Sequence, residues 1–298
     1  MGNMPALALS VVLFVGLSAC GGGSPGGSRP SPAVPAATPS PSASPSLSPA
    51  AAAASHVFLI VMENHSFAQA ITQPYTAQLA ATYAVATNYH AVSHPSLPNY
   101  LALTSGSTWG ISDDNYHSLP AGGLGTQLTQ RGLSWRAYME GLGGSCLSNG
   151  NGYAVKHNPF AYYGGGCPSN VVPMTALDGD LAGDTPRFVW ITPDQCHDGH
   201  DCGARTADDF LGKLVPRILA SSAWQQGGVL FITWDEDDGG GDNHVLTLVV
   251  SSRLAAHSSN RPHDHYSLLA TVEDQLAVPR QSWLGQAATA DPLNELLH

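Results

Sequence analysis

Apolar runs that stop abruptly at acidic residues are the clearest pattern along this chain. The run His56–Met62 (HVFLIVM) is apolar and β-branched, and it stops at Glu63 and Asn64, which predicts a buried strand of a parallel sheet. Arg187–Asp194 (RFVWITPD) and Val229–Asp238 (VLFITWDEDD) have the same form. Ligands of open α/β sheets bind at the carboxyl ends of parallel strands, so we expect these acidic ends to converge.

Segments between these runs have helical spacing, with apolar residues recurring every three or four positions. His244–Ser251 reads as a further buried strand. Strands and helices therefore alternate, and the expected fold class is α/β, with a doubly wound, mainly parallel sheet between helix layers. The irregular stretch Ser145–Thr185 is expected to be a long insertion over the site. Within it we favour a solvated charge for Lys156, and contact with a phosphate is the alternative. The predicted helices are Pro74–Thr87, Thr126–Met139, Thr206–Ser222 and Tyr266–Val278.

The beginning of the chain cannot pack a core. Met4–Ala19 is apolar, too short to span a bilayer, and ends Leu-Ser-Ala before Cys20, which resembles a bacterial lipobox. We expect 1–19 to be a lipoprotein signal peptide and Cys20 to be lipidated, anchoring the protein outside the cytoplasmic membrane; a plainly cleaved, secreted protein is the alternative. Residues 20–54 are nearly all Gly, Ser, Pro and Ala and are expected to be a disordered linker before one domain, 55–298.

Four cysteines remain when Cys20 is set aside. An even number in an oxidising compartment indicates disulfides, and of the possible pairings we favour neighbours, Cys146–Cys167 and Cys196–Cys202. A cysteine-based zinc site is the rival interpretation, but these cysteines lack the short CxxC spacing that would support it.

Charge and histidine content narrow the possible functions. The chain has 22 Asp and Glu against 11 Lys and Arg and no basic stripe, which argues against nucleic acid as a partner. Its 13 histidines lie mostly beside acids or turns, which favours metal or acid–base chemistry. A cluster of carboxylates at one sheet edge would repel itself strongly unless a cation lay among them.

Ser96 is a candidate nucleophile. It precedes Leu97 in the segment His94–Gly106, at the expected start of a helix whose first turn tolerates Pro98. The free amides of a helix N-terminus favour a phosphate or a developing alkoxide. Serine is also a preferred N-cap, so a capping role is the alternative. The side-chain amide of Asn99 is placed to donate to a non-bridging oxygen of a bound ester.

Five motifs in order resemble those of the bacterial phosphoesterase family: ENHSF, HPSLPNYLALTSG, PDQCHDGHDC, WDEDDGGGDNHV and HDHYSLLATVEDQL. This family contains acid phosphatases and phosphatidylcholine-type phospholipases C and lies within the alkaline phosphatase superfamily. The chain is most similar to the SapM-like branch of secreted acid phosphatases. The resemblance covers about residues 56–280 and implies an alkaline phosphatase-like fold and a serine nucleophile that becomes phosphorylated.

The resemblance also implies roles for individual residues. Glu63 and Asn64 match the pair that binds a metal ion after the first strand, and Ser96 matches the nucleophile. Asp235 and Glu236 match the acidic pair that completes the metal site.

Histidines complete the implied site. His244 and His265 match histidines that line the same pocket, the first counted as a metal ligand and the second as catalytic. In PDQCHDGHDC, Asp198 matches a metal ligand and His200 a catalytic residue. A second pair in that segment has suitable chemistry, and the choice stays open: Asp194 and His197.

The resemblance implies a metal-dependent phosphomonoesterase that acts outside the cytoplasmic membrane on small phosphate esters or phosphorylated lipid headgroups. One or two divalent metal ions are expected, and oxygen ligands with some histidine suit zinc, magnesium, manganese or calcium. A phospholipase C or other phosphodiesterase is the second hypothesis. A catalytically silent surface-binding lipoprotein is the third.

Overall fold

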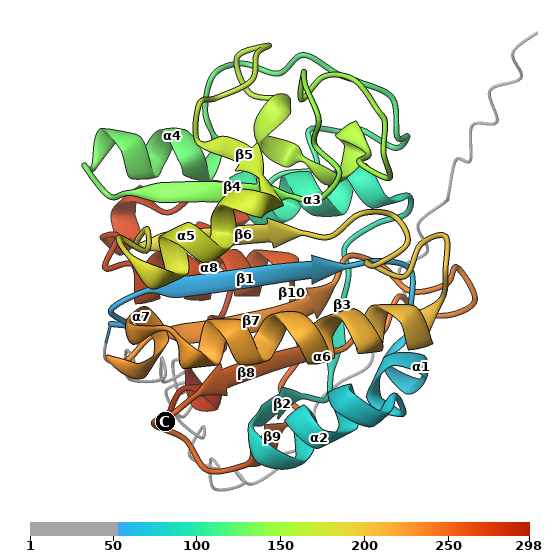
Figure 1. Cartoon of the computed structure of the whole chain (residues 1–298), viewed down its shortest axis with the longest axis vertical. Coiled ribbons are helices and arrows are strands. Elements are labelled where there is room, and N and C mark those ends of the chain that lie inside the picture. Colours follow the sequence, from blue (N-terminus) through green and yellow to red (C-terminus); the bar gives the residue numbers. More distant parts are fainter. Residues whose placement is uncertain (1–52) are drawn as a thin grey trace, which may run out of the picture. The chain divides into compact units, whose positions relative to one another are not determined.

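The computed structural model describes residues 53–298 (Figure 1). The predicted signal peptide, the lipidation of Cys20 and nearly all of the predicted linker lie outside the described residues. Ala54, which the sequence assigned to that linker, is 4% exposed and packs in the core. Among the described residues, no helix is long and apolar enough to cross a membrane.

The three apolar runs form the centre of an eight-stranded sheet. All residues of β1 (Val57–Met62) are buried, and β1 pairs in parallel with β6 (Phe188–Thr192) and β7 (Val229–Trp234). Near-continuous apolar sequence suits such strands because both of their faces are covered. The strand order across the sheet is β5-β4-β6-β1-β7-β8-β2-β9.

The remaining strands extend this sheet on both sides. β4 (Trp135–Met139) is parallel to β6, and β5 (Val171–Pro173) is parallel to β4. β8 (Thr247–Ser251) is antiparallel to both β7 and β2 (Ala84–Ala86), and β9 (His257–Ser259) is parallel to β2. Only β8 therefore opposes the other strands of this sheet, and the predicted mainly parallel α/β fold is confirmed.

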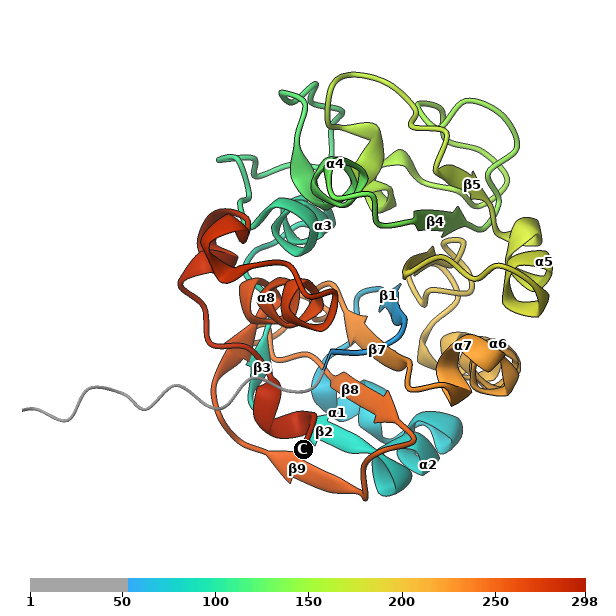
Figure 2. The ribbon, with the colours of Figure 1, turned by 90° about the vertical axis from the view of Figure 1, so that its left-hand side faces the viewer.

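Helices cover both faces of the sheet (Figure 2). One face carries α3 (Ser96–Ser105), which packs against α4 (Gly123–Gln130) and α8 (His265–Gln275). The other face carries α1 (Phe67–Ile71), α2 (Pro74–Thr82), α5 (Leu177–Ala182), α6 (Ala204–Ala220) and α7 (Ser222–Gln225). Smaller elements are the paired strands β3 (Tyr89–His90) and β10 (His263–Asp264) and the 3-10 turns η1 (Val155–His157), η2 (Pro159–Ala161), η3 (Met174–Ala176), η4 (Arg280–Ser282), η5 (Gly285–Ala288) and η6 (Asn294–Leu296).

Two predicted helices extend into segments that form strands. The helix predicted over Pro74–Thr87 ends at Thr82, and the residues after it form β2. The helix predicted over Thr126–Met139 ends before Gly132, whose φ of 68° closes the turn, and the residues after it form β4. In both cases the later apolar residues are buried by pairing in the sheet, which overrides local helical spacing.

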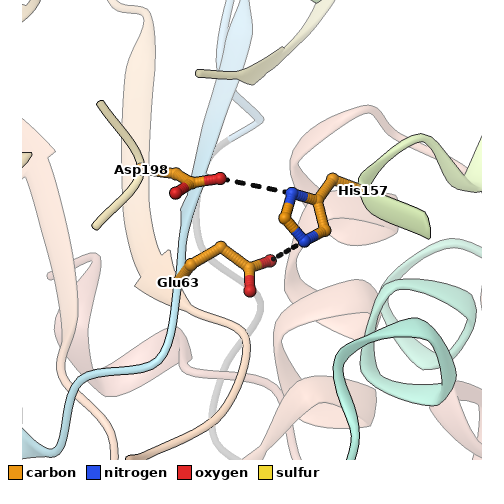
Figure 3. A group of neighbouring side chains, drawn as sticks. All are labelled: Glu63, His157 and Asp198. Carbon is orange, nitrogen blue, oxygen red and sulfur yellow. Dashed lines mark ion pairs between the residues drawn. The ribbon is translucent and has the colours of Figure 1, made fainter. Parts of the chain in front are cut away.

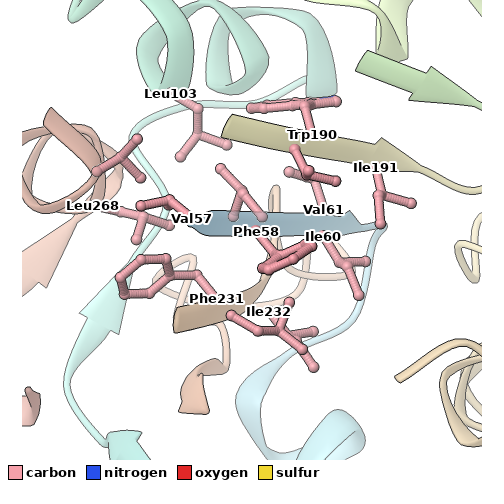
Figure 4. Packing of buried hydrophobic residues seen from close by; sticks show 14 of the residues in the cluster. Val57, Phe58, Ile60, Val61, Leu103, Trp190, Ile191, Phe231, Ile232 and Leu268 are labelled. Atoms are coloured by element: carbon pink, nitrogen blue, oxygen red, sulfur yellow. The ribbon is translucent and has the colours of Figure 1, made fainter. Parts of the chain in front are cut away.

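The core on either side of β1 holds the sheet edge in place. Phe58 and Ile60 share one face of the strand and alternate with Val57 and Val61 on the other, and all are fully buried (Figure 4). Full burial of each such side chain contributes about 1.5–3 kcal/mol. This packing fixes the carboxyl ends of β1, β6 and β7 at a single rim, where the acidic residues begin.

Candidate active site

Three buried ionisable side chains meet beyond the ends of the central strands (Figure 3). Glu63 directly follows β1, Asp198 lies in the loop after β6, and His157 is the last residue of η1. His157 Nε2 is 3.2 Å from Glu63 Oε1, and His157 Nδ1 is 3.2 Å from Asp198 Oδ2. Their side chains are 2%, 0% and 0% exposed for His157, Glu63 and Asp198.

Oxygen atoms of the two residues that follow β7, Asp235 and Glu236, lie next to these three side chains. The N–H of Asp235, the residue after β7, donates to the carbonyl of Met62 at 2.9 Å, which aligns the ends of β1 and β7. The backbone N–H of Asn64 donates to Asp235 Oδ1 at 3.3 Å, and its side-chain amide donates to Glu236 Oε1 at 3.1 Å. The structure therefore brings together Glu63, Asn64, Asp198, Asp235 and Glu236, the five acidic and amide residues expected to bind a metal ion.

Ser96 lies between two of these carboxylates. It is the first residue of α3, Pro95 occupies the N-cap position, and no side chain caps this helix. Ser96 Oγ is 3.1 Å from Glu63 Oε2 and 3.1 Å from Glu236 Oε1, with the hydroxyl as donor. The alternative that Ser96 is only an N-cap is therefore wrong.

Electrostatic repulsion within this set is strong. Burial raises the pKa of Glu63, Asp198 and Asp235 well above their ordinary values, and neighbouring carboxylates raise it further. Burial also raises the pKa of Glu236 and lowers that of His157 well below its ordinary value. A bound cation would relieve this repulsion and favour ionised carboxylates and a neutral imidazole.

Several buried atoms in this set have no hydrogen-bond partner. They are Asn64 Oδ1, both ring nitrogens of His157, Asp198 Oδ2 and Asp235 Oδ2. Leaving buried polar atoms without partners is costly, and the 3.2 Å contacts of His157 lack hydrogen-bond geometry. Carboxylate, amide and imidazole groups are all ligands of divalent cations. Ligand atoms of Glu63, His157 and Asp198 lie within 4.8 Å of one another, so the residues present fit a divalent metal ion.

His244 does not join this set, contrary to the role expected for it. Its Nε2 atom is 3.1 Å from the carbonyl of Thr87, and its ring stacks on those of Phe67 and His90. Its position between two rings explains its orientation better than a metal does.

His265 lies behind the site and does not face it. Its ring is fully buried, with Nδ1 2.9 Å from the hydroxyl of Tyr89 and Nε2 2.6 Å from the backbone carbonyl of Asp235. Burial lowers its pKa to about 4. Both ring nitrogens are engaged, so His265 fits a positioning role for Asp235 and not the predicted catalytic contact.

Asn99 has a similar supporting role. Its side-chain oxygen accepts from the N–H groups of Val92 and Ser93, and its amide donates to the carbonyls of Ser93 and Pro95. These bonds order the turn that leads into Ser96. They leave the amide no hydrogen for a substrate oxygen, so the predicted donation to an ester does not fit this geometry.

The two candidate pairs in the loop after β6, Asp198 with His200 and Asp194 with His197, lie in different places. Asp198 enters the buried set, whereas Asp194 and His197 lie beside Glu140, whose Oε2 is 3.0 Å from His197 Nδ1. The predicted disulfide Cys196–Cys202 closes this loop, and Cys146–Cys167 closes the insertion, so the favoured pairing is confirmed.

Gly199 lets this loop approach β1. Its φ is 109°, and a Cβ there would lie 3.2 Å from the carbonyl of Glu63 and 2.9 Å from the ring of His65. A side chain at this position would push the loop away from Glu63. The glycine is therefore required for the close contact in which Glu63 N–H donates to the carbonyl of Asp198 at 2.9 Å.

Tyr100 and His94 also belong to the site, although the sequence did not predict a role for them. The Tyr100 hydroxyl donates to Glu63 Oε1 at 2.6 Å, and its ring stacks on His157 with centroids 5.4 Å apart. The sequence signal for Tyr100 was its position one helical turn after Ser96, which places both side chains on the same face of the helix. His94 Nδ1 is 2.6 Å from Glu236 Oε2, and proximity to Ser96 was its only sequence signal.

Lys156 is not the solvated loop charge that the sequence predicted. Its side chain is 19% exposed, and its Nζ is 3.0 Å from Asp114 Oδ2 and 3.5 Å from Ser96 Oγ. His200 Nε2 is 3.3 Å from the same nitrogen, while His200 Nδ1 is 2.7 Å from Asp201 Oδ1. Lys156 and His157 come from an irregular insertion in which no periodicity marks their direction.

Comparisons with known proteins found a matching family and several sequence relatives. The sequence model of the Phosphoesterase family matches residues 69–279. A phosphatidylinositol-3-phosphatase of Mycobacterium tuberculosis is 30% identical over 253 residues, covering 81% of this chain and 82% of its own. A probable acid phosphatase of Kluyveromyces lactis is 28% identical over 250 residues, covering 76% of this chain and 59% of its own.

A solved structure supports the fold. A protein of the alkaline phosphatase superfamily from Vibrio parahaemolyticus superposes with a TM-score of 0.57, covering 79% of this chain and 71% of its own. Its sequence identity is 14%, so the likeness concerns the fold alone. The expected alkaline phosphatase-like architecture is thereby confirmed.

Proposed function

Because this chain belongs to the phosphoesterase family and is a phosphoric ester hydrolase, we propose that it is a metal-dependent phosphomonoesterase with Ser96 as nucleophile. The position of Ser96 Oγ, 3.1 Å from carboxylates of both Glu63 and Glu236, carries this proposal. A divalent ion would supply Lewis-acid stabilisation of negative charge on the serine oxygen. The residues that would hold it are Glu63, Asn64, His157, Asp198, Asp235 and Glu236.

The chain's own residues account for bond exchange and proton movement. Ser96 Oγ attacks phosphorus, and the bond between phosphorus and the leaving alcohol oxygen breaks as the phosphoserine forms; the departing alkoxide takes a proton from solvent and leaves as the alcohol. The hydroxyl proton has an exit through Glu236, whose other carboxylate oxygen contacts His94, a residue with a 43% exposed side chain. Water then attacks the phosphoserine, which releases inorganic phosphate and restores the hydroxyl.

The proposed substrates are phosphate monoesters, either small or part of a phosphorylated lipid headgroup. The similarity to a protein named phosphatidylinositol-3-phosphatase supports the second class. We propose a location outside the cytoplasmic membrane, through a lipidated Cys20 or as a secreted protein. The two disulfides support an oxidising compartment.

Parallel assays test this function. A chromogenic phosphomonoester, a bis-ester and a phosphocholine ester are compared for the purified protein before and after dialysis against EDTA. We expect the monoester to be hydrolysed fastest, dialysis to abolish the activity, and a divalent ion to restore it. Full activity in protein shown metal-free by elemental analysis would refute metal dependence, and faster bis-ester hydrolysis would refute the monoesterase assignment.

A further inference from the structure

Lys156 is a cation held against the candidate nucleophile. We propose that Lys156 contacts the phosphoryl group of the substrate and makes the site prefer dianionic monoesters to monoanionic diesters. This inference rests on the proposed function and adds to it a residue that determines ester class.

The contacts of Lys156 fix its ammonium group on one side of Ser96. Nζ is 3.0 Å from Asp114 Oδ2, 3.3 Å from His200 Nε2 and 3.5 Å from Ser96 Oγ. Asp114 is itself held, because its Oδ1 accepts from the N–H of Leu97 at 3.0 Å. A phosphorus bonded to Ser96 Oγ would carry oxygens two bonds beyond Oγ, within reach of this ammonium.

The charge around Ser96 makes such a cation necessary for binding an anionic ester. Four carboxylates lie in the site, two of them in contact with Ser96, and one divalent ion would offset only half of their charge when all four are ionised. The residual negative potential would repel a phosphate ester unless a further positive group faced it. Those carboxylates belong to Glu63, Asp198, Asp235 and Glu236.

Charge also separates the two classes of ester. A phosphate monoester has a second pKa of about 6 and carries nearly two negative charges at neutral pH, whereas a diester carries one. Coulomb attraction is proportional to the charge, so a fixed ammonium attracts the monoester about twice as strongly. Partial burial of Lys156 reduces solvent screening of this difference.

Space beside Lys156 is available to a substrate. A cavity of about 330 Å³ is lined by Lys156 and Asp114 together with Tyr116 and Tyr162. Lys156 thus lines this cavity and also contacts Ser96. A purely structural role, in which the ion pair with Asp114 only ties the insertion to α3, would not require the lysine to contact the nucleophile as well as line a cavity.

Variants of the two lysines separate these roles. We expect Lys156→Gln to lower kcat/KM for the chromogenic monoester about 100-fold and for the bis-ester less than about 5-fold. Lys156→Arg keeps the charge and is expected to retain at least about a tenth of the monoesterase activity. Lys213→Gln is the matched control, because Lys213 is exposed on α6, and its activity should equal that of the wild type.

Further readouts make each outcome decisive. Binding of inorganic phosphate, measured by calorimetry on the metal-loaded protein, should weaken at least about 10-fold in Lys156→Gln. Equal losses of kcat/KM for the monoester and the bis-ester in Lys156→Gln would overturn the inference. So would a lower melting temperature with an unchanged ratio of the two kcat/KM values and unchanged phosphate binding. A wild-type protein that binds phosphate through Lys156 yet hydrolyses no monoester would refute the proposed function and leave the phosphate contact standing.

Discussion

Ser96 contributes an oxygen to the site and nothing to the capping of its helix. Ser96→Ala is therefore expected to lower kcat at least about 1,000-fold, because it removes the attacking atom, while changing the melting temperature by no more than a few degrees. Steady-state kinetics and thermal melting measure the two effects. In the wild type, a phosphorylated Ser96 peptide should be trapped at low pH.

Ser222→Ala is the matched control, since Ser222 is also the first residue of a helix but is exposed on α7. It should leave kcat unchanged. If Ser96→Ala kept more than about a tenth of the wild-type activity, another group would have to be the nucleophile.

Individual site residues differ in how well the sequence predicted them. Glu63 and Asp235 were predictable because each directly follows a buried parallel strand, so topology alone brings them to one rim. His157 was not, because it is carried by a short turn in an irregular insertion. His244 was misassigned because its place beside an acidic run says nothing about ring direction, which stacking on Phe67 fixes.

The loop closed by Cys196–Cys202 carries both Asp198 and His200. A closure this short contributes only about 2 kcal/mol in the chain-entropy model, so its larger effect should be on the position of these side chains. We expect Cys196→Ser/Cys202→Ser to weaken metal binding and turnover at least about 10-fold while lowering the melting temperature by only a few degrees.

Metal titration and thermal melting of this double variant measure those effects. A matched comparison is Cys146→Ser/Cys167→Ser, which opens the insertion and leaves the Asp198 loop closed. It should affect phosphate binding at Lys156 more than metal affinity. Unchanged metal affinity in the Cys196→Ser/Cys202→Ser protein would show that hydrogen bonds alone order the loop.

Secondary-structure elements were predictable where local pattern and burial agree. The strands β1, β6 and β7 are apolar throughout and buried throughout, so pattern and environment coincide. β2 and β4 were absorbed into predicted helices because each follows a helix after only a few residues. Pairing partners far away in sequence decided their conformation.

Stability of the whole domain should depend on pH through Glu273. This buried residue of α8 accepts from Gln127 Nε2 at 2.6 Å and from the N–H of Leu284 at 3.1 Å, which joins α8 to α4 and the C-terminal segment. Burial raises its pKa from 4.5 to about 7, against the effect of these hydrogen bonds. The folded state therefore binds the Glu273 proton more tightly than the unfolded state does.

Protonation of Glu273 adds to the free energy of unfolding. This addition is fully present below pH 4.5 and is lost as the pH rises through about 7. Glu273→Gln cannot ionise, so its free energy of unfolding should fall less over this interval than that of the wild type. Denaturant unfolding at several pH values measures this difference in the free energy of unfolding. The carboxylates of the candidate active site are present in both proteins, so their contribution to the pH dependence is the same in each. Asp209→Asn, an exposed change on α6, should follow the wild-type curve; a Glu273→Gln curve parallel to it would contradict this assignment.

The architecture of the molecule followed from the alternation of strands and helices, but the direction of β8 did not. Its apolar run is compatible with either direction. The connection from β7, residues 235–246, forms no helix, and the chain returns beside β7 in the antiparallel direction. The reversal extends the sheet beyond β7 without a crossover helix at that point.

The disulfide Cys146–Cys167 spans the exposed segment that contains Leu147, which is 40% exposed. A protease that cut the chain just after Leu147 would separate β1, β2 and β4 from β6, β7 and η1. The two pieces would still be joined covalently by this bond and non-covalently by the pairing of β4 with β6. Such a nicked protein would migrate as one species until it is reduced, and its intact size would conceal the cleavage.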